Sequence, residues 1–332
     1  MKKLNICVLG DGGWGTTLTL LLYRKGFSVT MWGAFSDYVK ELEKTRLNKR
    51  FLPGVKIPQE INITHDIEEA LYDKQLIVVA TPSQHMREVL RKIKKLDYPR
   101  NAIYLSVTKG IEVGSLKRMS EVIREELGAR RVAVLSGPTI ALEVALGIPT
   151  TAVIASYDKK LRESLQAIFM TERFRIYTNS DVIGIELGGS LKNVIAIACG
   201  VSDGLGFGTN TKAAILSRGL AEISRLGQAM GAKLKTFFGI SGLGDLVTTC
   251  ISPYSRNRFV GEEIGKGKTV THIKTHMQMV AEGIATTRSA YELSLEYNID
   301  MPITREVYFI LYKHKNPLKA VKDLMTREKK EE

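Results

Sequence analysis

A lysine and an asparagine, Lys192 and Asn193, stand side by side in a segment, residues 184–200, that is otherwise mostly apolar or small. The apolar residues recur at helical spacing, which predicts a helix with one buried stripe. Desolvation is costly for an unpaired ammonium group and favours the neutral form, which is the form that acts as a base. Either the lysine carries out chemistry in this helix, or its flexible stem carries the charge to the surface.

Two glycines, Gly188 and Gly189, precede this pair within the same expected helix. Each glycine weakens a helix by about 1 kcal/mol relative to alanine. The missing side chains therefore predict a close approach, either of a ligand or of a neighbouring helix.

A glycine-rich turn follows the first apolar run of the chain. Residues 4–9 have the length and composition of a strand, Gly10, Gly12 and Gly15 follow in the pattern G-x-G-x-x-G, and a helix is expected over 16–25. A second apolar strand comes next, and this context favours a dinucleotide-binding turn over a turn without a ligand. The first two glycines permit a tight turn close to a pyrophosphate, and the third lets the helix pack on the strand.

The acid that usually binds the adenosine ribose is missing from the second strand. An acid at the end of that strand binds the 2′-hydroxyl of NAD, whereas a nearby arginine accommodates the 2′-phosphate of NADP. Here the strand ends in Trp32-Gly33-Ala34-Phe35. We assign Ala34 and Phe35 to the cofactor site by their position, and the preference between NAD and NADP stays open.

Strand and helix signals alternate through the first half of the chain and then change. Further strands are expected at 61–64, 76–80, 103–107, 132–135, 150–155 and 174–177, separated by helical segments. This alternation is typical of an α/β fold with a doubly wound parallel sheet. After about residue 180 the strand signals vanish. We predict a Rossmann-type dinucleotide-binding domain over residues 1–182 and an all-helical substrate and catalytic domain over 183–332.

Polar stretches follow three of the expected strands. They are Thr81-Pro-Ser83, Thr108-Lys109-Gly110 and Ser136-Gly137-Pro-Thr139. Ligands of doubly wound sheets gather outside the carboxyl ends of the strands. Each stretch alone is compatible with ordinary turn chemistry. The three together, near a dinucleotide turn, predict a ligand site.

The helical half has polar clusters of its own. Asp245 and Thr249 are four residues apart and share one helical face. The expected loop at Ser255, Arg256 and Asn257 suits a phosphate or another anion. The alternative interpretation of this loop is an exposed basic turn.

Neither the histidines nor the cysteines form a metal-ligand pattern. His272 and His276 are four residues apart, but no carboxylate or third ligand stands near them, so we expect a surface pair and no metal site. The three cysteines, Cys7, Cys199 and Cys250, are sparse and odd in number. This count argues against a disulfide framework and fits a reducing compartment.

Composition points to anionic partners. The chain of 332 residues has a formal net charge of +13, and its basic residues are spread along the whole length. We therefore expect phosphorylated small molecules as ligands and no nucleic acid, because a concentrated basic arm is lacking. No apolar run approaches the length of a membrane span. We expect a cytoplasmic protein without membrane insertion.

With these motifs in view, the chain resembles the bacterial NAD(P)-dependent glycerol-3-phosphate dehydrogenases over nearly its whole length. The shared motifs occur in one order and at the family's spacing. They are the G-x-G-x-W-G-T turn at 10–16, Thr108-Lys-Gly110, Ser136-Gly-Pro-Thr139, the run 188–197, Ser202-Asp-Gly-Leu-Gly-Phe-Gly208, Gly242-Leu-Gly-Asp-Leu246, Ser255-Arg-Asn257, Val280-Ala-Glu-Gly283 and Met301-Pro-Ile-Thr304.

The resemblance implies sn-glycerol 3-phosphate and dihydroxyacetone phosphate as the substrate pair, NAD or NADP as the cofactor, a homodimer, and a role in glycerophospholipid synthesis. Lys192 would be the proton donor and acceptor at the C2 oxygen, with Lys109 beside it and Asp245 orienting an ammonium group. The residues that we assign to the substrate are Lys109, Gly137, Thr139, Lys192, Asn193, Asp245, Thr249, Ser255, Arg256 and Asn257. Those that we assign to the cofactor are Gly10, Gly12, Gly13, Trp14, Gly15, Ala34, Phe35, Ser83, Lys109, Ala141, Arg256, Val280 and Glu282. Ala34 departs from the arginine or histidine that the family commonly has at this position.

Two other functions compete with this one. A β-hydroxyacid dehydrogenase would share the dinucleotide domain, the helical domain and a catalytic lysine, but Ser255-Arg-Asn257 and Gly242–Leu246 favour a phosphorylated substrate. A redox-sensing regulator that binds nucleic acid would need a helix-turn-helix or a basic arm, and the sequence has neither.

Overall fold

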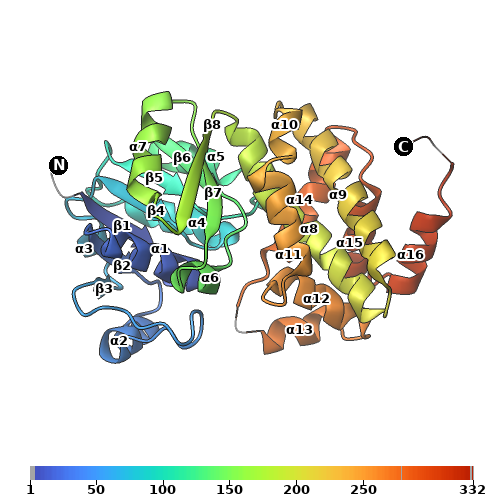
Figure 1. The fold of residues 1–332 in the computed structure, drawn as a ribbon, viewed down its shortest axis with the longest axis horizontal. Helices are drawn as coiled ribbons and strands as arrows, with labels where there is room; N and C mark the ends of the chain where they lie inside the picture. Colours follow the sequence, from blue (N-terminus) through green and yellow to red (C-terminus); the bar gives the residue numbers. More distant parts are fainter. Residues whose placement is uncertain (1–3, 278, 330, 332) are drawn as a thin grey trace. The chain divides into compact units, whose positions relative to one another are not determined.

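The computed structural model describes residues 4–277, 279–329 and 331. The chain forms two compact units, Met1–Lys109 with Lys117–Glu186, and Gly110–Leu116 with Leu187–Glu332 (Figure 1). The short segment Gly110–Leu116 therefore belongs to the second unit although it lies between two elements of the first. One hydrogen bond that holds it there runs from Ser289 Oγ to the carbonyl oxygen of Ile111, at 3.2 Å.

The first unit is an α/β structure, as predicted. Its elements are β1 (Asn5–Leu9), α1 (Gly13–Arg24), β2 (Ser28–Trp32), α2 (Ser36–Thr45), β3 (Asn62–Thr64), α3 (Ile67–Leu71), β4 (Leu76–Val79), α4 (Ser83–Lys94), β5 (Ile103–Ser106), α5 (Met119–Leu127), β6 (Val132–Ser136), α6 (Ala141–Ala145), β7 (Thr150–Ala155), α7 (Lys159–Phe169) and β8 (Phe174–Asn179). The eight strands form one sheet in the order β3-β2-β1-β4-β5-β6-β7-β8. The order reverses direction beside β1, which is the switch point where doubly wound sheets bind ligands.

Both faces of this sheet are buried at its inner strands β1, β4, β5 and β6, which explains why these strands are mostly apolar. Ile6 and Val8 of β1 pack in one cluster with residues of α1 and α7. Cys7 and Leu9 of the same strand pack in another cluster with residues of α4 and α5. Successive side chains of a strand point to opposite faces, so one short strand supplies two cores.

The last two strands differ from the prediction of a parallel sheet. β7 pairs antiparallel with β6, and β8 pairs parallel with β7. A parallel crossover needs a long connection, usually a full helix. The link between β6 and β7 contains only the five-residue helix α6, so the chain turns back beside β6. Strands β1 to β6 stay parallel, and their carboxyl ends share one edge.

The second unit is helical in the described residues. Its elements are α8 (Val182–Gly204), whose first turn lies in the first unit, α9 (Thr209–Ala229), α10 (Leu234–Phe237), the π-helix η1 (Ile240–Gly244), α11 (Asp245–Ile251), α12 (Arg256–Gly265), α13 (Val270–His276), α14 (Glu282–Glu296), α15 (Pro302–Lys313) and α16 (Pro317–Met325).

The helix α8 corrects one expectation from the sequence. By length and mean hydropathy it could cross a membrane, so the statement that no apolar run approaches that length was wrong. However, 94% of the apolar window is buried inside the protein. A core helix that is covered on all sides is apolar all round for that reason.

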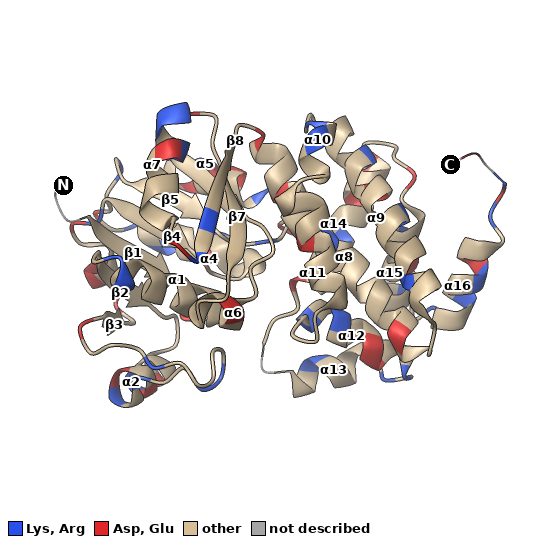
Figure 2. Ribbon diagram, in the orientation of Figure 1, with Lys and Arg blue, Asp and Glu red and all other residues tan. Residues whose placement is uncertain are grey.

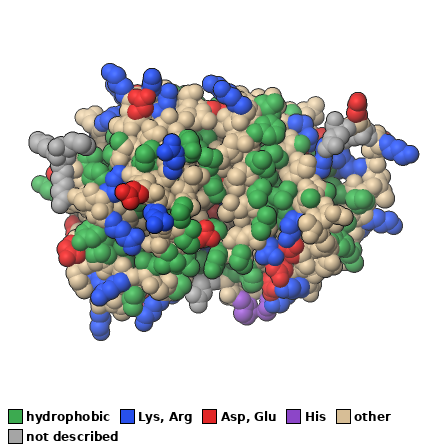
Figure 3. Space-filling view, in the orientation of Figure 1, with side chains coloured by type: hydrophobic (Ala, Val, Ile, Leu, Met, Phe, Trp, Pro, Cys, Tyr) green, Lys and Arg blue, Asp and Glu red, His purple; other side chains and the backbone are tan. Residues whose placement is uncertain are grey.

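Charged side chains are dispersed over the described residues. Lys and Arg occur on many elements of both units, interspersed with Asp and Glu (Figure 2). The face in Figure 3 likewise shows separate basic side chains with acidic ones among them. The basic side chains on this face are thus dispersed and do not form one concentrated patch.

Candidate functional site

The glycine-rich turn connects β1 to α1, and three of its glycines are required by the packing of the protein itself. A Cβ on Gly10 would lie 2.7 Å from the carbonyl oxygen of Ala80, and Gly10 has a φ of +129°. A Cβ on Gly13 would lie 2.5 Å from the carbonyl oxygen of Phe51, and one on Gly15 would lie 1.9 Å from that of Gly10. Backbone atoms cannot move aside cheaply, so these positions exclude side chains.

Gly12 differs from the other three, because a Cβ there would meet no atom within 4 Å. It is the N-cap of α1, and the first turn of α1 contains no acidic residue. The first N–H groups of a helix have no partner within the helix and favour a phosphate. The open space at Gly12 and this helix end fit the pyrophosphate of a dinucleotide.

An asparagine that the sequence analysis did not single out holds the turn in place. Asn48, 1% exposed, donates hydrogen bonds from Nδ2 to the carbonyl oxygen of Asp11 and to Thr16 Oγ1, both at 2.7 Å. Its Oδ1 accepts a hydrogen bond from Tyr38 at 2.7 Å. Asn48 lies outside the regular elements, and its partners lie on distant segments of the chain. Its burial is visible only in the structure, so nothing in the sequence signals this role.

The other residues predicted for the cofactor in the first unit lie at strand ends or beside the turn. Ala141, which starts α6, accepts a hydrogen bond at its carbonyl oxygen from Thr17 Oγ1 of α1 at 3.0 Å. Ala34 and Phe35 follow β2, and Phe35 is 73% exposed. Ser83 is buried and begins α4 after β4.

Trp14 lies in the first turn of α1. Its ring packs edge-on against Phe174, with 6.4 Å between centroids. Its Nε1 is buried and has no hydrogen-bond partner among the described residues. A buried donor of this kind calls for a partner.

Lys109, after β5, meets the stretch after β6, as the sheet edge predicts. Its Nζ donates hydrogen bonds to the carbonyl oxygen of Gly137 at 2.7 Å and to Thr139 Oγ1 at 3.2 Å. Gly137 has a φ of +145°, and a Cβ there would lie 3.0 Å from Ala152 Cα. The three predicted residues therefore form one cluster in the first unit.

In the second unit, the lysine of the central helix is buried. Lys192 of α8 has a side chain that is 6% exposed, and its Nζ forms an ion pair with Asp245 Oδ1. The same Nζ donates a hydrogen bond to Thr249 Oγ1 at 2.5 Å. Asp245 and Thr249 share one face of α11, as predicted, and Thr249 Oγ1 also donates to the carbonyl oxygen of Asp245 at 2.7 Å. The alternative of a lysine that reaches the surface is wrong, because pairing compensates for desolvation inside the unit.

Glycines bring α11 to this lysine. A Cβ on Gly188 of α8 would lie 2.8 Å from the carbonyl oxygen of Ser241 in η1. A Cβ on Gly242 would lie 2.1 Å from that of Phe237. The π-helix η1 thus lies against α8 and leads directly into Asp245. Single π-turns of this kind are frequent at functional sites. The close approach that Gly188 predicts is made by a neighbouring segment of the protein.

Asn193 is linked to the predicted anion-binding residues. A Cβ on Gly200 of α8 would lie 1.9 Å from the carbonyl oxygen of Arg258, so α8 and α12 meet backbone to backbone. At this contact Asn257 Nδ2 donates a hydrogen bond to Asn193 Oδ1 at 2.9 Å. Asn257 Oδ1 accepts one from Gly283 N at 2.9 Å. The amides of Asn193 and Asn257 hold three helices together.

The expected loop at residues 255–257 is in fact the start of a helix. Ser255 is the N-cap of α12, and its side chain accepts a hydrogen bond from Arg258 N at 3.2 Å. Arg256 is exposed and donates from Nη1 to the carbonyl oxygen of Val280 at 2.8 Å. Glu282 begins α14 nearby. A helix amino end with an arginine can bind an anion, since its N–H groups and its dipole add to the guanidinium.

The predicted residues therefore fall into two sets. One set, around the glycine-rich turn and Lys109, belongs to the first unit, and the other, around Lys192 and Arg256, belongs to the second.

Comparison with known proteins identifies the family. The model of the NAD-dependent glycerol-3-phosphate dehydrogenase N-terminus matches residues 5–162, and that of the C-terminus matches residues 181–322. A glycerol-3-phosphate dehydrogenase [NAD(P)+] from Thermoanaerobacter sp. is 51% identical and covers 99% of both chains. One from Prosthecochloris aestuarii is 50% identical over 98% of this chain and 99% of its own.

A solved structure is similar as well. The crystal structure of glycerol-3-phosphate dehydrogenase from Coxiella burnetii has a TM-score of 0.94 and 38% sequence identity, covering 98% of this chain and 99% of that chain. The glycine-rich turn, the buried Lys192 and these matches agree, and the chain belongs to the NAD-dependent glycerol-3-phosphate dehydrogenase family.

Proposed function

We propose that this chain catalyses the NAD(P)-dependent interconversion of sn-glycerol 3-phosphate and dihydroxyacetone phosphate, with Lys192 as the proton donor and acceptor at the C2 oxygen. Family membership supports the reaction. The observation that carries the assignment of Lys192 is the burial of its ammonium group against Asp245 Oδ1 and Thr249 Oγ1. A group held in one orientation away from water is suited to proton transfer.

The turn between β1 and α1 would hold the cofactor. Backbone N–H groups at Gly13, Trp14 and Gly15 would bind the pyrophosphate, and the absence of a side chain at Gly12 leaves room for its approach. When bound, the cofactor supplies or accepts the hydride at C2. Lys109, with Gly137 and Thr139, keeps the substrate role that the family resemblance implies.

Lys192 would handle the proton in both directions. In reduction, its ammonium group donates a hydrogen bond to the C2 ketone oxygen and transfers the proton as that oxygen gains negative charge. In oxidation, the neutral amine accepts the proton of the C2 hydroxyl. Asp245 orients Nζ in both directions and compensates for its charge. General acid and base catalysis of this kind contributes about 10²–10⁴-fold to a rate.

The amino end of α12 would bind the substrate phosphate. Ser255 caps this helix and Arg256 contributes a guanidinium, so charge, helix dipole and N–H groups converge. Asn193 and Asn257 are occupied with each other, and we assign them to positioning α8 and α12.

The test is a steady-state comparison of the full chain with Lys192→Met, following the loss of reduced cofactor with dihydroxyacetone phosphate. We expect kcat to fall by about 10²–10⁴-fold while cofactor affinity is retained, because only proton transfer is removed. Lys192→Met removes the cation that pairs with the buried Asp245, and the loss of one partner of a buried ion pair destabilises a protein by about 3–5 kcal/mol. The double variant Lys192→Met/Asp245→Asn removes both charges and serves when the single variant does not fold.

Substrate controls test the assignment of the phosphate site. Dihydroxyacetone without the phosphate should react poorly with the native chain. Arg256→Gln should raise KM for dihydroxyacetone phosphate and leave the weak reaction with dihydroxyacetone unchanged. Normal turnover in a folded Lys192 variant would overturn the role of that lysine. Turnover of a β-hydroxyacid but not of dihydroxyacetone phosphate would overturn the substrate.

Family membership also supports further proposals about organisation. We assign residues 1–182 to cofactor binding and residues 183–332 to substrate binding and catalysis. A homodimer, a cytoplasmic location and a contribution to glycerophospholipid synthesis are proposed on the same basis. Light scattering of the purified chain tests the homodimer.

A further inference from the structure

A carboxylate lies at the end of β2 although β2 itself carries no acid. A Cβ built on Gly33 would stand 2.4 Å from Asp11 Oδ2 and 2.6 Å from Val39 Cγ2. Residue 33 has no room for a side chain because Asp11, from the turn after β1, occupies that space. The position where an acid normally recognises the adenosine ribose is thus filled from a different strand connection.

The backbone of Asp11 is fixed, so its carboxylate has a defined position. Its carbonyl oxygen accepts hydrogen bonds from Asn48 Nδ2 at 2.7 Å and from Thr16 Oγ1 at 3.2 Å. Asn48 and Thr16 are themselves buried and bonded to each other. A side chain that projects from such a backbone is preorganised for a ligand, which lowers the entropy lost on binding.

One oxygen of this carboxylate lacks a partner. Asp11 Oδ2 is buried and receives no hydrogen bond from any described residue. Burial raises the pKa of Asp11, and the nearby Arg50 acts in the opposite direction. A buried acceptor without a donor is unfavourable, and native structures keep such groups mainly where a ligand or a function requires them. As a residue Asp11 is half-buried, so part of its surface is open toward a ligand.

Arg50 is the competing group at this end of the sheet. Its guanidinium lies 4.9 Å from the ring centroid of Tyr38 and 5.8 Å from that of Phe51. An arginine of this kind would attract a 2′-phosphate. However, Arg50 is exposed and screened by water and salt, whereas the carboxylate of Asp11 is desolvated. We therefore expect the repulsion between Asp11 and a phosphate dianion to outweigh the attraction of Arg50.

We propose that Asp11 accepts a hydrogen bond from the 2′-hydroxyl of the adenosine ribose and repels a 2′-phosphate, so that this chain prefers NAD(H) to NADP(H). The proposal rests on the dinucleotide-binding part of the proposed function and not on the identity of the substrate. It makes the second residue of the G-x-G-x-x-G turn the determinant of cofactor specificity.

The test measures binding of two fragments, ADP-ribose and its 2′-phosphate, to the full chain by titration calorimetry. We expect the native chain to bind ADP-ribose at least about tenfold more tightly than the 2′-phosphate, as the loss of a hydrogen bond to a charged group predicts. Asp11→Asn keeps the size but removes the charge, and it should bring the two affinities close together. Arg50→Gln is the matched control, and it should leave the affinity for ADP-ribose unchanged. The ratio of kcat/KM for NADH and NADPH should follow the same order.

Two results would overturn the proposal. One is a native chain that binds the 2′-phosphate as tightly as ADP-ribose, and the other is an Asp11→Asn variant that keeps the native ratio. If Asp11→Asn does not fold, the smaller Asp11→Ser replaces it, with thermal unfolding as the check. Binding of neither fragment would overturn the dinucleotide site together with this proposal. Selective binding of ADP-ribose without turnover of dihydroxyacetone phosphate would overturn the reaction alone and leave the role of Asp11 standing.

Discussion

The two sets of candidate residues are built in opposite ways, one from missing side chains and the other from buried ones. In the first unit, Gly10 and Gly15 lie so close to backbone oxygens that any side chain would collide. In the second unit, Lys192 and Asp245 are charged side chains that are almost fully buried against each other. The first arrangement tolerates no added atoms, and the second tolerates no lost partner. Substitutions should therefore damage the two units through different mechanisms.

Among substitutions in the first unit, the largest effect on stability is expected for Gly15→Ala. The added Cβ would lie 1.9 Å from the carbonyl oxygen of Gly10, and neither β1 nor α1 can shift without opening a core. Overpacking of this severity costs about 3 kcal/mol or more. We expect a lower free energy of unfolding in urea, together with loss of cofactor binding in a fluorescence titration.

Gly12→Ala is the matched control for that substitution. Its φ of −64° suits alanine, and the added Cβ would meet no protein atom within 4 Å. Stability should change by less than about 1 kcal/mol, because the entropy that alanine removes from the unfolded chain is offset by its poor fit to the N-cap position. Cofactor affinity should fall because the methyl group stands where the pyrophosphate approaches. Equal destabilisation by the two alanines would contradict the distinction between packing glycines and a ligand glycine.

A buried acid in the second unit should give the next largest effect, this time through pH. Glu222 of α9 is 1% exposed and accepts hydrogen bonds at the start of α15 from Ile303 N at 2.6 Å, Thr304 N at 3.1 Å and Thr304 Oγ1 at 3.0 Å. Burial raises the pKa of Glu222 to about 7, although these hydrogen bonds oppose the shift.

The folded state therefore holds the proton of Glu222 more tightly than the unfolded state does. Its contribution to stability is complete below pH 4.5, the ordinary pKa, and is lost as the pH rises through about 7. The loss is at most about 3 kcal/mol. Glu222→Gln should remove this part of the pH dependence of the unfolding free energy, whereas Glu296→Gln, at an exposed position, should keep it. Identical pH profiles for the native chain and Glu222→Gln would rule out this linkage.

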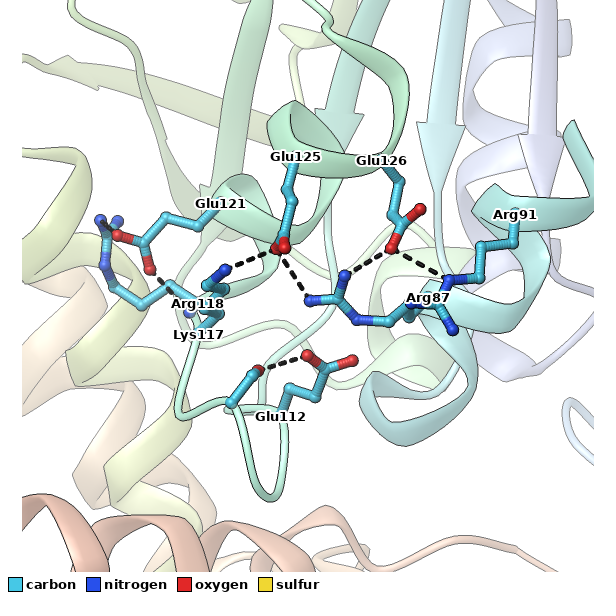
Figure 4. Close-up of polar contacts among 9 residues, drawn as sticks. Arg87, Arg91, Glu112, Lys117, Arg118, Glu121, Glu125 and Glu126 are labelled. Carbon is cyan, nitrogen blue, oxygen red and sulfur yellow. Dashed lines mark hydrogen bonds and ion pairs between the residues drawn. The ribbon is translucent and has the colours of Figure 1, made fainter. Parts of the chain in front are cut away.

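Surface charges of the first unit should give the smallest effect. Figure 4 shows a network between α4 and α5 in which Arg87 reaches Glu125 and Glu126, Lys117 reaches Glu125 and Arg91 reaches Glu126. Hydrogen bonds from Lys117 and Arg87 lower the pKa of Glu125 to about 2. The network is extensive, but most of its members face water.

Arg91→Ala should change the free energy of unfolding by less than about 1 kcal/mol, since the Arg91 side chain is 63% exposed. The difference should shrink further in high salt, because solvent ions screen exposed pairs. Urea unfolding at low and high ionic strength measures both. A loss as large as that of Gly15→Ala would show that exposed pairs, and not only buried groups, determine stability in this chain.

Much of the fold could be predicted from local sequence, for a physical reason. The inner strands β1, β4, β5 and β6 are mostly apolar runs, because both faces of the sheet are covered there, and each run ends at a turn signal. The direction of β7 and β8 was not predictable from those runs, since the pattern of a strand is the same in both directions. The prediction of a parallel sheet was wrong for β7, which is antiparallel to β6 because the link between these strands is short and contains only the helix α6.

The candidate site likewise has features that local sequence predicts and contacts that it does not. The turn at residues 10–15 and the helical face of Asp245 and Thr249 were visible in the sequence, because their spacing is local. The pairing of Lys192 with Asp245 joins residues 53 positions apart, and the hydrogen bond between Asn193 and Asn257 joins residues 64 positions apart. Local spacing carries no information about such distant partners.

The sequence by itself determined the family, the two kinds of architecture and the identity of the dinucleotide turn, because these depend on composition, period and spacing along the chain. Only the tertiary structure decided that Lys192 is buried and paired, that Arg256 stands at the start of a helix, and that Asp11 takes the place of the acid absent from β2. These three features depend on which distant segments of the chain come into contact, and the packing between helices and strands determines those contacts.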